Sequence, residues 1–145
     1  MILWAEDENE AAKVAQWAAL RIPHVSSFGP CQAAAVERHG RTAAVVVFHD
    51  WQDVGRSLQV SIAAETPLWA SRATLAGLLR YAFVRAGAEV LWSAMPSDNV
   101  RAIKFNTGIG FKREAVLRRR FGPKRHAVIT SMTRQEWQRS QWGNA

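Results

Sequence analysis

Residues 57–95 read SLQVSIAAETPLWASRATLAGLLRYAFVRAGAEVLWSAM, and they carry the strongest structural signal in the chain. Apolar and small polar residues alternate strictly over 57–64, which predicts a strand. Leucine, alanine and phenylalanine then recur at helical spacing over 73–86 until Gly87, and an apolar run at 90–95 predicts a second strand. A strand, a crossover helix and a strand in one sheet are parallel and connected with right-handed chirality.

The residues before this unit predict a strand at 1–4 and a helix that follows the N-cap Asp7 and ends near Ile22. Two further runs, 31–37 and 42–49, flank His39-Gly40-Arg41 and favour a β-hairpin, with residues 50–56 as the loop that leads into the central unit.

The residues after the unit predict a short helix over 99–109 and two strands around the turn at Gly122-Pro123. In the first of these strands, 111–121, we expect Phe111, Ala115 and Leu117 to face inward. The second strand, 125–132, leads into a capping box at 133–136. Hairpins on both sides of a parallel pair indicate an α+β fold, a mixed sheet flanked by helices, in one domain over residues 1–145.

Size and composition exclude several classes of protein. The chain has 145 residues, 48% of them hydrophobic and 21% charged, which is typical of one globular domain and not of a disordered, collagen-like or coiled-coil chain. Cys31 is the only cysteine, so no internal disulfide forms. The longest apolar run is much shorter than the ~20 residues of a membrane span, and the acidic first ten residues are unlike a leader peptide. We therefore expect a soluble cytoplasmic protein without a membrane partner.

Basic residues are concentrated in the second half. Residues 1–70 hold five Lys or Arg against eight Asp or Glu, whereas residues 71–145 hold fourteen against four, so the two halves carry −3 and +10 of the net +7. Such an asymmetry indicates an anionic partner, whether a phosphorylated cofactor, a nucleic acid or an acidic protein face. The alternative is a solvated basic surface.

Common metal and nucleophile signatures are missing from the sequence. The four histidines are scattered and one cysteine cannot form a zinc cluster, so we expect no metal. The pair His49-Asp50 suggests a phosphohydrolase but has no partner histidines, and Cys31 fits a buried small apolar residue better than a nucleophile.

One stretch adds a family resemblance. Residues 99–118, NVRAIKFNTGIGFKREAVLR, resemble the C-terminal motif of the GNAT superfamily of N-acetyltransferases, Asn-x-x-Ala-x-x-Phe/Leu followed by Gly-Phe and a further strand. Residues 79–83 and 132–137 are similar to the branch that includes the ribosomal-protein N-terminal acetyltransferases, and Trp69-Ala-Ser-Arg72 is similar to a phage-encoded subgroup. Together these motifs cover about half of the chain.

The resemblance implies that strands 57–64 and 90–95 splay apart to admit acetyl-CoA. Amides of the first strand would hold the pantetheine and the acetyl carbonyl, and the following loop and helix start would hold the pyrophosphate. Asn99 would lie near the thioester, with Phe105 beside the pantetheine. The alternatives are a turn residue for Asn99 and a core aromatic for Phe105. The residues expected to bind the cofactor are Ile62, Ala63, Ala64, Ala70, Ser71, Arg72, Ala73, Asn99, Ala102 and Phe105.

Two departures from the family pattern concern chemistry. The phosphate loop at 69–73 has no glycine, so we expect Arg72 to supply charge where the family uses close backbone contacts, although it could also be a solvated helix-start residue. Asn106 stands at the position where many members have a tyrosine that protonates the leaving thiolate, and water would then do so.

The resemblance further implies direct attack of an amine on the thioester in a ternary complex. A lysine-like amine has a pKa near ~10.4, so its deprotonation at neutral pH costs about 4 to 5 kcal/mol. Glu65, at the end of the first splayed strand, is the carboxylate placed to act as the base, and Asn106 is the second candidate catalytic position. The simpler interpretation of Glu65 is a solvated charge.

Two other functions fit the same sequence. Arg118, Arg119, Arg120, Lys124 and Arg125 surround the Gly122-Pro123 turn and could form a nucleic-acid-binding tip. Alternatively, a catalytically degenerate member of the fold could bind a protein through some of its seven tryptophans.

Overall fold

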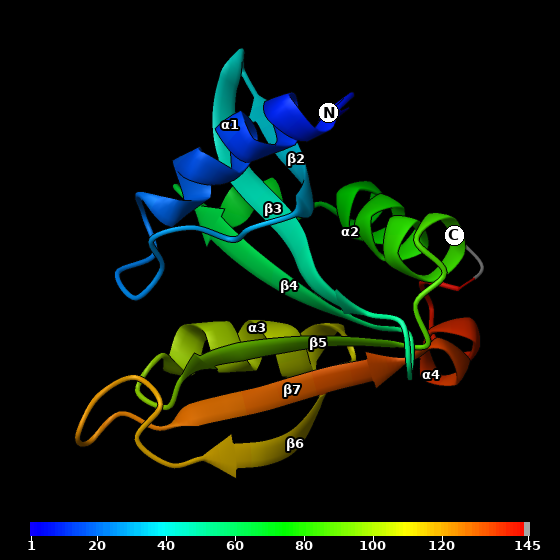
Figure 1. Cartoon of the computed structure of the whole chain (residues 1–145). Coiled ribbons are helices and arrows are strands. Elements are labelled where there is room, and N and C mark those ends of the chain that lie inside the picture. Colours follow the sequence, from blue (N-terminus) through cyan, green and yellow to red (C-terminus); the bar gives the residue numbers. More distant parts are fainter. Residues whose placement is uncertain (144–145) are drawn as a thin grey trace.

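The computed structural model describes residues 1–143 as one α+β domain built on a mixed sheet (Figure 1). Its strands are β1 Ile2–Trp4, β2 Cys31–Arg38, β3 Arg41–Gln52, β4 Ser57–Ala64, β5 Val90–Pro96, β6 Lys112–Leu117 and β7 Ala127–Thr133. Its helices are α1 Glu8–Ala19, α2 Arg72–Arg80, α3 Val100–Ile109 and α4 Arg134–Arg139, with a short 3-10 turn η1 at Pro67–Trp69 and a π-helical turn η2 at Tyr81–Arg85.

The strand order across the sheet is β1-β2-β3-β4-β5-β7-β6, and β4 and β5 are the parallel pair. All other neighbours run antiparallel. The crossover between β4 and β5 is made by α2 and η2, so the expected strand-helix-strand unit and the mixed sheet are confirmed.

Two hydrophobic layers cover opposite faces of the sheet. On one face, helix α2 packs Leu75, Leu78 and Leu79 against the alternate β4 residues Leu58 and Val60. On the other face, α1 packs alanines against β2, β3 and Ala63 of β4. Each side chain of β4 therefore faces either α1 or the pair α2 and α3, and this alternation decides what each residue of β4 can contact.

The ends of several elements differ from the sequence expectation. Helix α1 ends at Ala19, three residues before Ile22, and residues 50–52, expected in a loop, continue strand β3 through an irregular register. The inward orientation predicted for Ala115 and Leu117 is wrong, because β6 is an edge strand whose residues are all exposed. Only Phe111, just before β6, is buried.

Among residues 1–143, no helix is long and apolar enough to cross a membrane.

Candidate active site

The parallel strands β4 and β5 separate after three residue pairs. Ser57, Leu58 and Gln59 lie opposite Val90, Leu91 and Trp92, and no later residue of β4 is paired with β5. Beyond this point β4 stays paired with β3, and β5 stays paired with β7. The expected splay is therefore confirmed, and Figure 1 shows the two strands diverging from their shared end.

Hydrogen-bond alternation shows which backbone groups of β4 face the gap. Glu65 N–H donates to the Ala43 carbonyl at 2.8 Å, in register with the β3–β4 ladder. In an antiparallel ladder, every second residue directs both backbone groups at its partner and the residues between direct theirs away. Val60, Ile62 and Ala64 are thus the residues whose N–H and C=O groups point toward the departed β5, whereas the amide of Ala63 points at β3.

The same argument applies to β5. Arg134 N–H donates to the Glu89 carbonyl and Ser97 N–H donates to the His126 carbonyl, both at 2.8 Å, so odd-numbered residues of β5 pair with β7. Ala94 therefore directs its amide and carbonyl into the gap from the opposite wall. The gap is bordered on both sides by backbone groups that have no partner in the sheet formed by residues 1–143.

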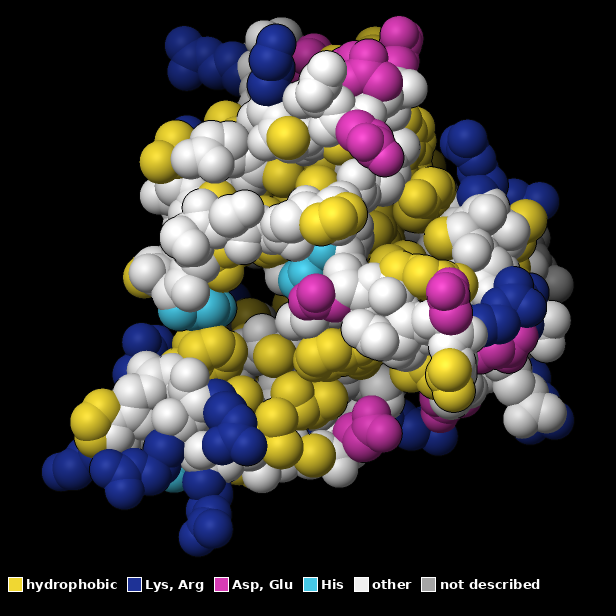
Figure 2. Space-filling view, viewed as in Figure 1, with side chains coloured by type: hydrophobic (Ala, Val, Ile, Leu, Met, Phe, Trp, Pro, Cys, Tyr) yellow, Lys and Arg dark blue, Asp and Glu magenta, His cyan; other side chains and the backbone are white. Residues whose placement is uncertain are grey.

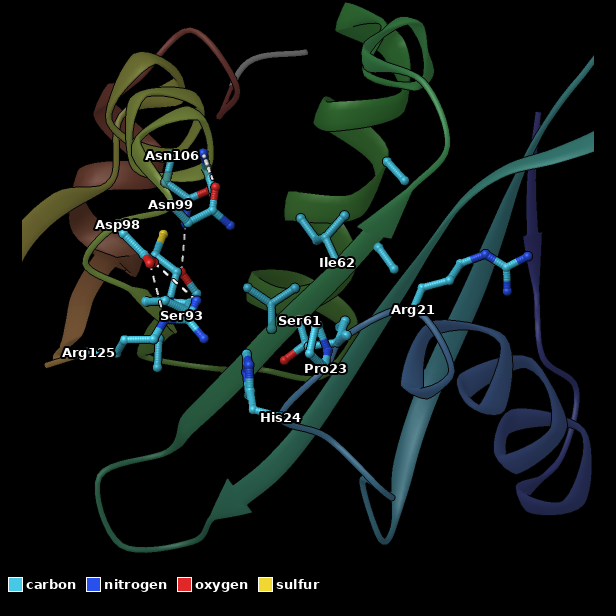
Figure 3. Close-up of a pocket in the computed structure, with 18 of the residues that line it drawn as sticks. Arg21, Pro23, His24, Ser61, Ile62, Ser93, Asp98, Asn99, Asn106 and Arg125 are labelled. Atoms are coloured by element: carbon cyan, nitrogen blue, oxygen red, sulfur yellow. Dashed lines mark hydrogen bonds and ion pairs between the residues drawn. The ribbon is translucent and has the colours of Figure 1, made fainter. Parts of the chain in front are cut away.

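A cleft of about 670 Å³ occupies the gap and opens toward the segment after α1. Figure 3 shows its two walls, with Ser61 and Ile62 on one and Ser93, Asn99 and Asn106 on the other. Seven of the residues predicted from sequence line this cleft: Ile62, Ala63, Ala64, Glu65, Asn99, Ala102 and Asn106.

Asn106 fixes the far wall. Its side chain is 8% exposed, and Nδ2 donates to Ser93 Oγ at 2.6 Å and to Thr130 Oγ1 at 3.0 Å. These bonds tie helix α3 to β5 and β7, and both donor hydrogens of the amide are used. Asn99 is the N-cap of α3, where Oδ1 accepts from Ala102 N–H at 3.2 Å, which leaves the first two amides of the helix free.

Ion pairs border the mouth of the cleft. Glu65 accepts a hydrogen bond from Arg21 Nε at 2.9 Å, and the guanidinium lies over the Trp17 ring. Across the mouth, Arg125 donates to both carboxylate oxygens of Asp98 at 3.1 Å, and this hydrogen bond lowers the pKa of Asp98. Both carboxylates are thus already engaged by arginine.

A contact between two rings also lies at the mouth, where His24 lines the cleft. The His24 ring lies 4.2 Å from the Phe121 ring, so the loop after α1 meets the β6–β7 loop. Partial burial, and secondarily the charge of Arg125, lower the pKa of His24 below its usual value. We call this contact the His24–Phe121 bridge.

The predicted phosphate loop lies apart from the lining of the cleft. Ser71 is the N-cap of α2: its Oγ accepts from Thr74 N–H and its carbonyl from Leu75 N–H, which leaves the amides of Arg72 and Ala73 free. The Arg72 guanidinium donates to Gln141 Oε1 at 2.6 Å and lies 5.5 Å from the centre of the Trp142 ring. It is held by the C-terminal segment.

Phe105 lies between the cleft and this loop. Its ring lies 5.6 Å from the buried ring of Trp69, and both line a small apolar cavity of about 30 Å³ that also contacts Asn106. The predicted site therefore consists of two parts, the cleft and the start of α2, with a pair of aromatic rings between them.

A three-residue cluster on β3 and β4 adds Ser61, which the sequence did not single out, to the pair His49-Asp50, which suggested only a phosphohydrolase. His49 Nε2 lies 2.8 Å from Ser61 Oγ, and His49 Nδ1 lies 3.0 Å from Asp50 Oδ2. Ser61 lines the cleft. The pairing of β3 with β4 could have predicted this contact. Its register places Gln59 opposite His49, and Ser61 lies two positions further along β4 on the same face.

The basic tip lies at the far end of the β6–β7 hairpin. Arg118, Arg119, Arg120 and Lys124 are exposed and, within residues 1–143, form no ion pair with a carboxylate. Figure 2 shows the positive side chains gathered there, below a hollow between the two halves of the molecule. Arg125 belongs to the Asp98 pair at the cleft. In the described part of the chain, no group of three or more His, Cys, Asp or Glu is arranged to hold a metal.

Comparisons with known proteins identify the fold. No family model matches the sequence, and no curated protein matches it. A chimera of the spermidine N-acetyltransferase SpeG from Vibrio cholerae and hSSAT superposes with a TM-score of 0.74 at 11% identity, over 94% of this chain and 98% of the other. SpeG itself, solved with manganese ions, gives 0.71 at 12% identity over 94% of both chains.

A protein from T. thermophilus assigned as an acetyltransferase gives a TM-score of 0.65 at 23% identity, over 83% of this chain and 65% of that one. The chain therefore spans about two thirds of that protein's length. At these identities the likeness concerns the fold, which is the α+β fold of the GNAT acetyltransferases.

Proposed function

We propose that this chain is an acetyl-CoA-dependent N-acetyltransferase, in which an amine attacks the thioester directly in a ternary complex held between β4 and β5. The observation that carries the proposal is the pair of free backbone edges facing the 670 Å³ cleft. Pantetheine is an extended chain with two amide groups, so it can add to a free strand edge through the same hydrogen bonds as a peptide. The groups that would receive it belong to Ile62 and Ala64 on β4, with Ala94 opposite.

The start of α2 is the proposed site for the pyrophosphate. Its two free amides, at Arg72 and Ala73, and the positive end of the helix dipole favour an anion, and the Arg72 guanidinium would add charge once released from Gln141. Ala70 and Ser71 complete the loop. Phe105 and Trp69 would pack along the arm that joins this site to the cleft.

The acceptor enters from the face opposite α3. The residues around that mouth come from the segment after α1 and from the Asp98–Arg125 pair. The structural neighbours named as spermidine N-acetyltransferases favour a small polyamine, whereas the motifs at 79–83 and 132–137 favour a protein amine of the ribosomal-protein type. We include both acceptor classes in the proposal, together with a phage-related origin and a cytoplasmic location.

Thermal unfolding with and without acetyl-CoA tests the cofactor. A ligand at about one hundred times its Kd stabilises the folded chain by about 2.7 kcal/mol, which for this size raises Tm by roughly 5 to 11 °C. We expect a saturable rise with one acetyl-CoA per chain. An unchanged Tm at millimolar acetyl-CoA would rule out the proposal.

A variant that fills the gap gives the matched test. Ala94→Phe adds a ring at a residue that lines the cleft, and Ala115→Phe adds the same ring on the exposed edge strand β6. We expect the acetyl-CoA shift to disappear in the first variant and to persist in the second. Equal shifts in both would show that the ligand binds elsewhere.

The basic tip supports a second candidate, nucleic-acid binding. Four exposed cations on one hairpin, free of carboxylate partners within residues 1–143, can contact several phosphates, and such binding weakens steeply with salt. Replacing Arg118, Arg119 and Arg120 with glutamine should abolish binding of a single-stranded oligonucleotide in moderate salt while leaving the acetyl-CoA shift intact. If the parent protein binds no oligonucleotide, this candidate is wrong.

A further inference from the structure

We propose that Ser61, His49 and Asp50 form a proton relay that removes the proton from the acceptor amine during acetyl transfer. Ser61 meets the amine in the cleft, His49 receives the proton and Asp50 connects the imidazole to solvent. This inference rests on the proposed function, since it names the base of that same site.

Ser61 lies where the relay needs its first member. It is on β4, two residues beyond Gln59, the last residue paired with β5, and it lines the cleft between Val60 and Ile62. Its amide is committed to β3 by the alternation of the ladder, while the amide of Ile62 points into the gap. A thioester held by Ile62 would therefore have the Ser61 hydroxyl as an immediate neighbour.

An irregular backbone brings Asp50 to His49. Successive side chains of a regular strand point to opposite faces, so neighbouring residues do not normally bond to each other through their side chains. Here the β3–β4 register shifts after His49, and Asp50 has a φ of 54°, in the left-handed region that aspartate tolerates. Such irregular positions are often found at functional sites.

The hydrogen bonds define the tautomer of His49. An ionised carboxylate can only accept, so Nδ1 carries the proton that is donated to Asp50 Oδ2. In the neutral imidazole, Nε2 is then an acceptor, and it takes the hydroxyl hydrogen of Ser61. This is the arrangement in which the imidazole can receive a proton through Ser61.

The surroundings of His49 favour the neutral form. Its side chain is 7% exposed and lies under the Phe28 ring, with Cys31 paired to it from β2 and Gln59 from β4. Burial lowers the pKa of His49, and the adjacent Asp50, the one charged group beside it among the described residues, partly offsets this. The imidazole is therefore free to accept a proton at neutral pH.

The far end of the relay reaches water. The Asp50 side chain is 59% exposed, so the imidazolium formed during the reaction is next to a solvated carboxylate. A proton taken from a closed cleft can leave through this side without crossing the bound cofactor.

Atoms and charges balance in the transfer step. The amine nitrogen forms a bond to the acetyl carbon, and the carbon–sulfur bond breaks to release CoA as the thiolate. The amine proton passes to Ser61 Oγ as the Ser61 hydroxyl proton passes to His49 Nε2. The imidazolium then returns its proton to solvent or, through water, to the thiolate.

Glu65 is the competing base. It lines the same cleft, but its carboxylate already accepts a hydrogen bond from Arg21 and lies at the exposed end of β4. Glu65 would have to give up its hydrogen bond with Arg21 to accept a proton. The imidazolium of His49, in contrast, would be stabilised by the neighbouring Asp50 carboxylate. The relay therefore assigns Glu65 to the acceptor-binding mouth.

Kinetics of single variants provide the first test. With the full-length chain, acetyl-CoA and a mixture of spermidine, a lysine peptide and peptides with free α-amines, thiol release measures turnover. Ser61→Ala and His49→Gln should lower kcat by about 10² to 10⁴, the usual contribution of a general base, with KM for acetyl-CoA little changed. Ser57→Ala, which removes the same hydroxyl from the same face of β4 but outside the cleft and away from His49, is the control and should keep the parent rate.

The pH profile separates a relay from a packing role. The parent rate should fall as His49 becomes protonated, below the usual histidine pKa, and His49→Gln should lose this limb. Asp50→Asn keeps the backbone and the acceptor oxygen but removes the charge, and should lower the pH of the limb. Unchanged rates and profiles in Ser61→Ala, with the acetyl-CoA shift intact, would overturn the relay while the proposed function stands.

Nuclear magnetic resonance tests the relay even if none of these amines is acetylated. The relay requires a neutral His49 with hydrogen on Nδ1 and none on Nε2 at pH 7, assigned by comparison with His49→Gln. Hydrogen on Nε2 would overturn it, because Ser61 could then pass no proton on. An acetyl group found on Ser61 after incubation with acetyl-CoA would also overturn it, in favour of a covalent nucleophile.

Discussion

At its start, β4 is paired on both edges, with Ser57 and Gln59 opposite residues of both β3 and β5, whereas from Val60 onward it is paired with β3 alone. The alternating pattern of β4 is the same in both regions, with Leu58, Val60 and Ile62 packed on the α2 face. What differs is the neighbouring strand, because β5 follows β7 and is fastened to α3 through Asn106. The loss of one neighbouring strand, without a change in the residue pattern of β4, leaves an unpaired backbone edge along the cleft.

The largest effect should come from breaking the paired region. Leu91 is 1% exposed and lies opposite Leu58, and Leu91→Ala removes packing that the neighbours cannot refill. We expect a loss of about 2 to 5 kcal/mol in the free energy of unfolding, measured in urea. Leu117→Ala, on the exposed edge strand, should cost less than about 0.5 kcal/mol, and comparable losses in the two would contradict the assignment of the core.

The start of α2, which follows the unpaired part of β4 along the chain, should respond in CoA affinity and not in the free energy of unfolding. Arg72→Ala removes the guanidinium at the start of α2 and should weaken CoA binding by about 1 to 3 kcal/mol, roughly 5- to 150-fold, by calorimetry. Arg80→Ala, at the other end of the same helix, is the control. If the two variants bind CoA equally well, Arg72 is no phosphate ligand.

Acid should destabilise the fold through His24 and His49, which lie near the cleft. Burial lowers the pKa of both His49 and His24 in the folded chain. Between those lowered values and the usual 6.5, the unfolded chain binds more protons, so stability is complete above about pH 6.5 and falls as pH decreases below it. Urea midpoints from pH 5 to 8 should show this slope, and it should be shallower in His49→Gln and in His24→Gln. A parent midpoint constant over this range would contradict it.

The smallest effect on stability should come from Glu65→Gln at the exposed end of β4. The ion pair with Arg21 is solvated, so its loss should change the free energy of unfolding by less than about 1 kcal/mol. Turnover should fall less than in Ser61→Ala, with the pH limb unmoved. A fall as large as that of Ser61→Ala, with a shifted pH profile, would make Glu65 the base.

Local periodicity was enough to predict the element order and the parallel unit, because each central element carries its own pattern. It failed at β6, where Ala115 and Leu117 alternate as if one face were covered although the strand lies at an edge. Whether a strand lies at the edge depends on the order of the strands in the sheet, and the residues of β6 alone do not determine that order.

The candidate site was predictable only in part. The motif at 99–118 pointed to Asn99 and Asn106, and both line the cleft. The Ser61–His49 contact needed the hairpin register, since the two residues are 12 positions apart, and the Asp50 contact needed a backbone irregularity that sequence does not mark. The engagement of Arg72 by Gln141 depends on where the C-terminal segment lies, which local patterns do not specify.

The His24–Phe121 bridge joins the loop after α1 to the β6–β7 loop at the mouth of the cleft, at the end away from the β4–β5 pairs. Under the proposed function, an acceptor would reach the cleft past this contact, and a folded polypeptide would need the two rings to part before its amine could enter.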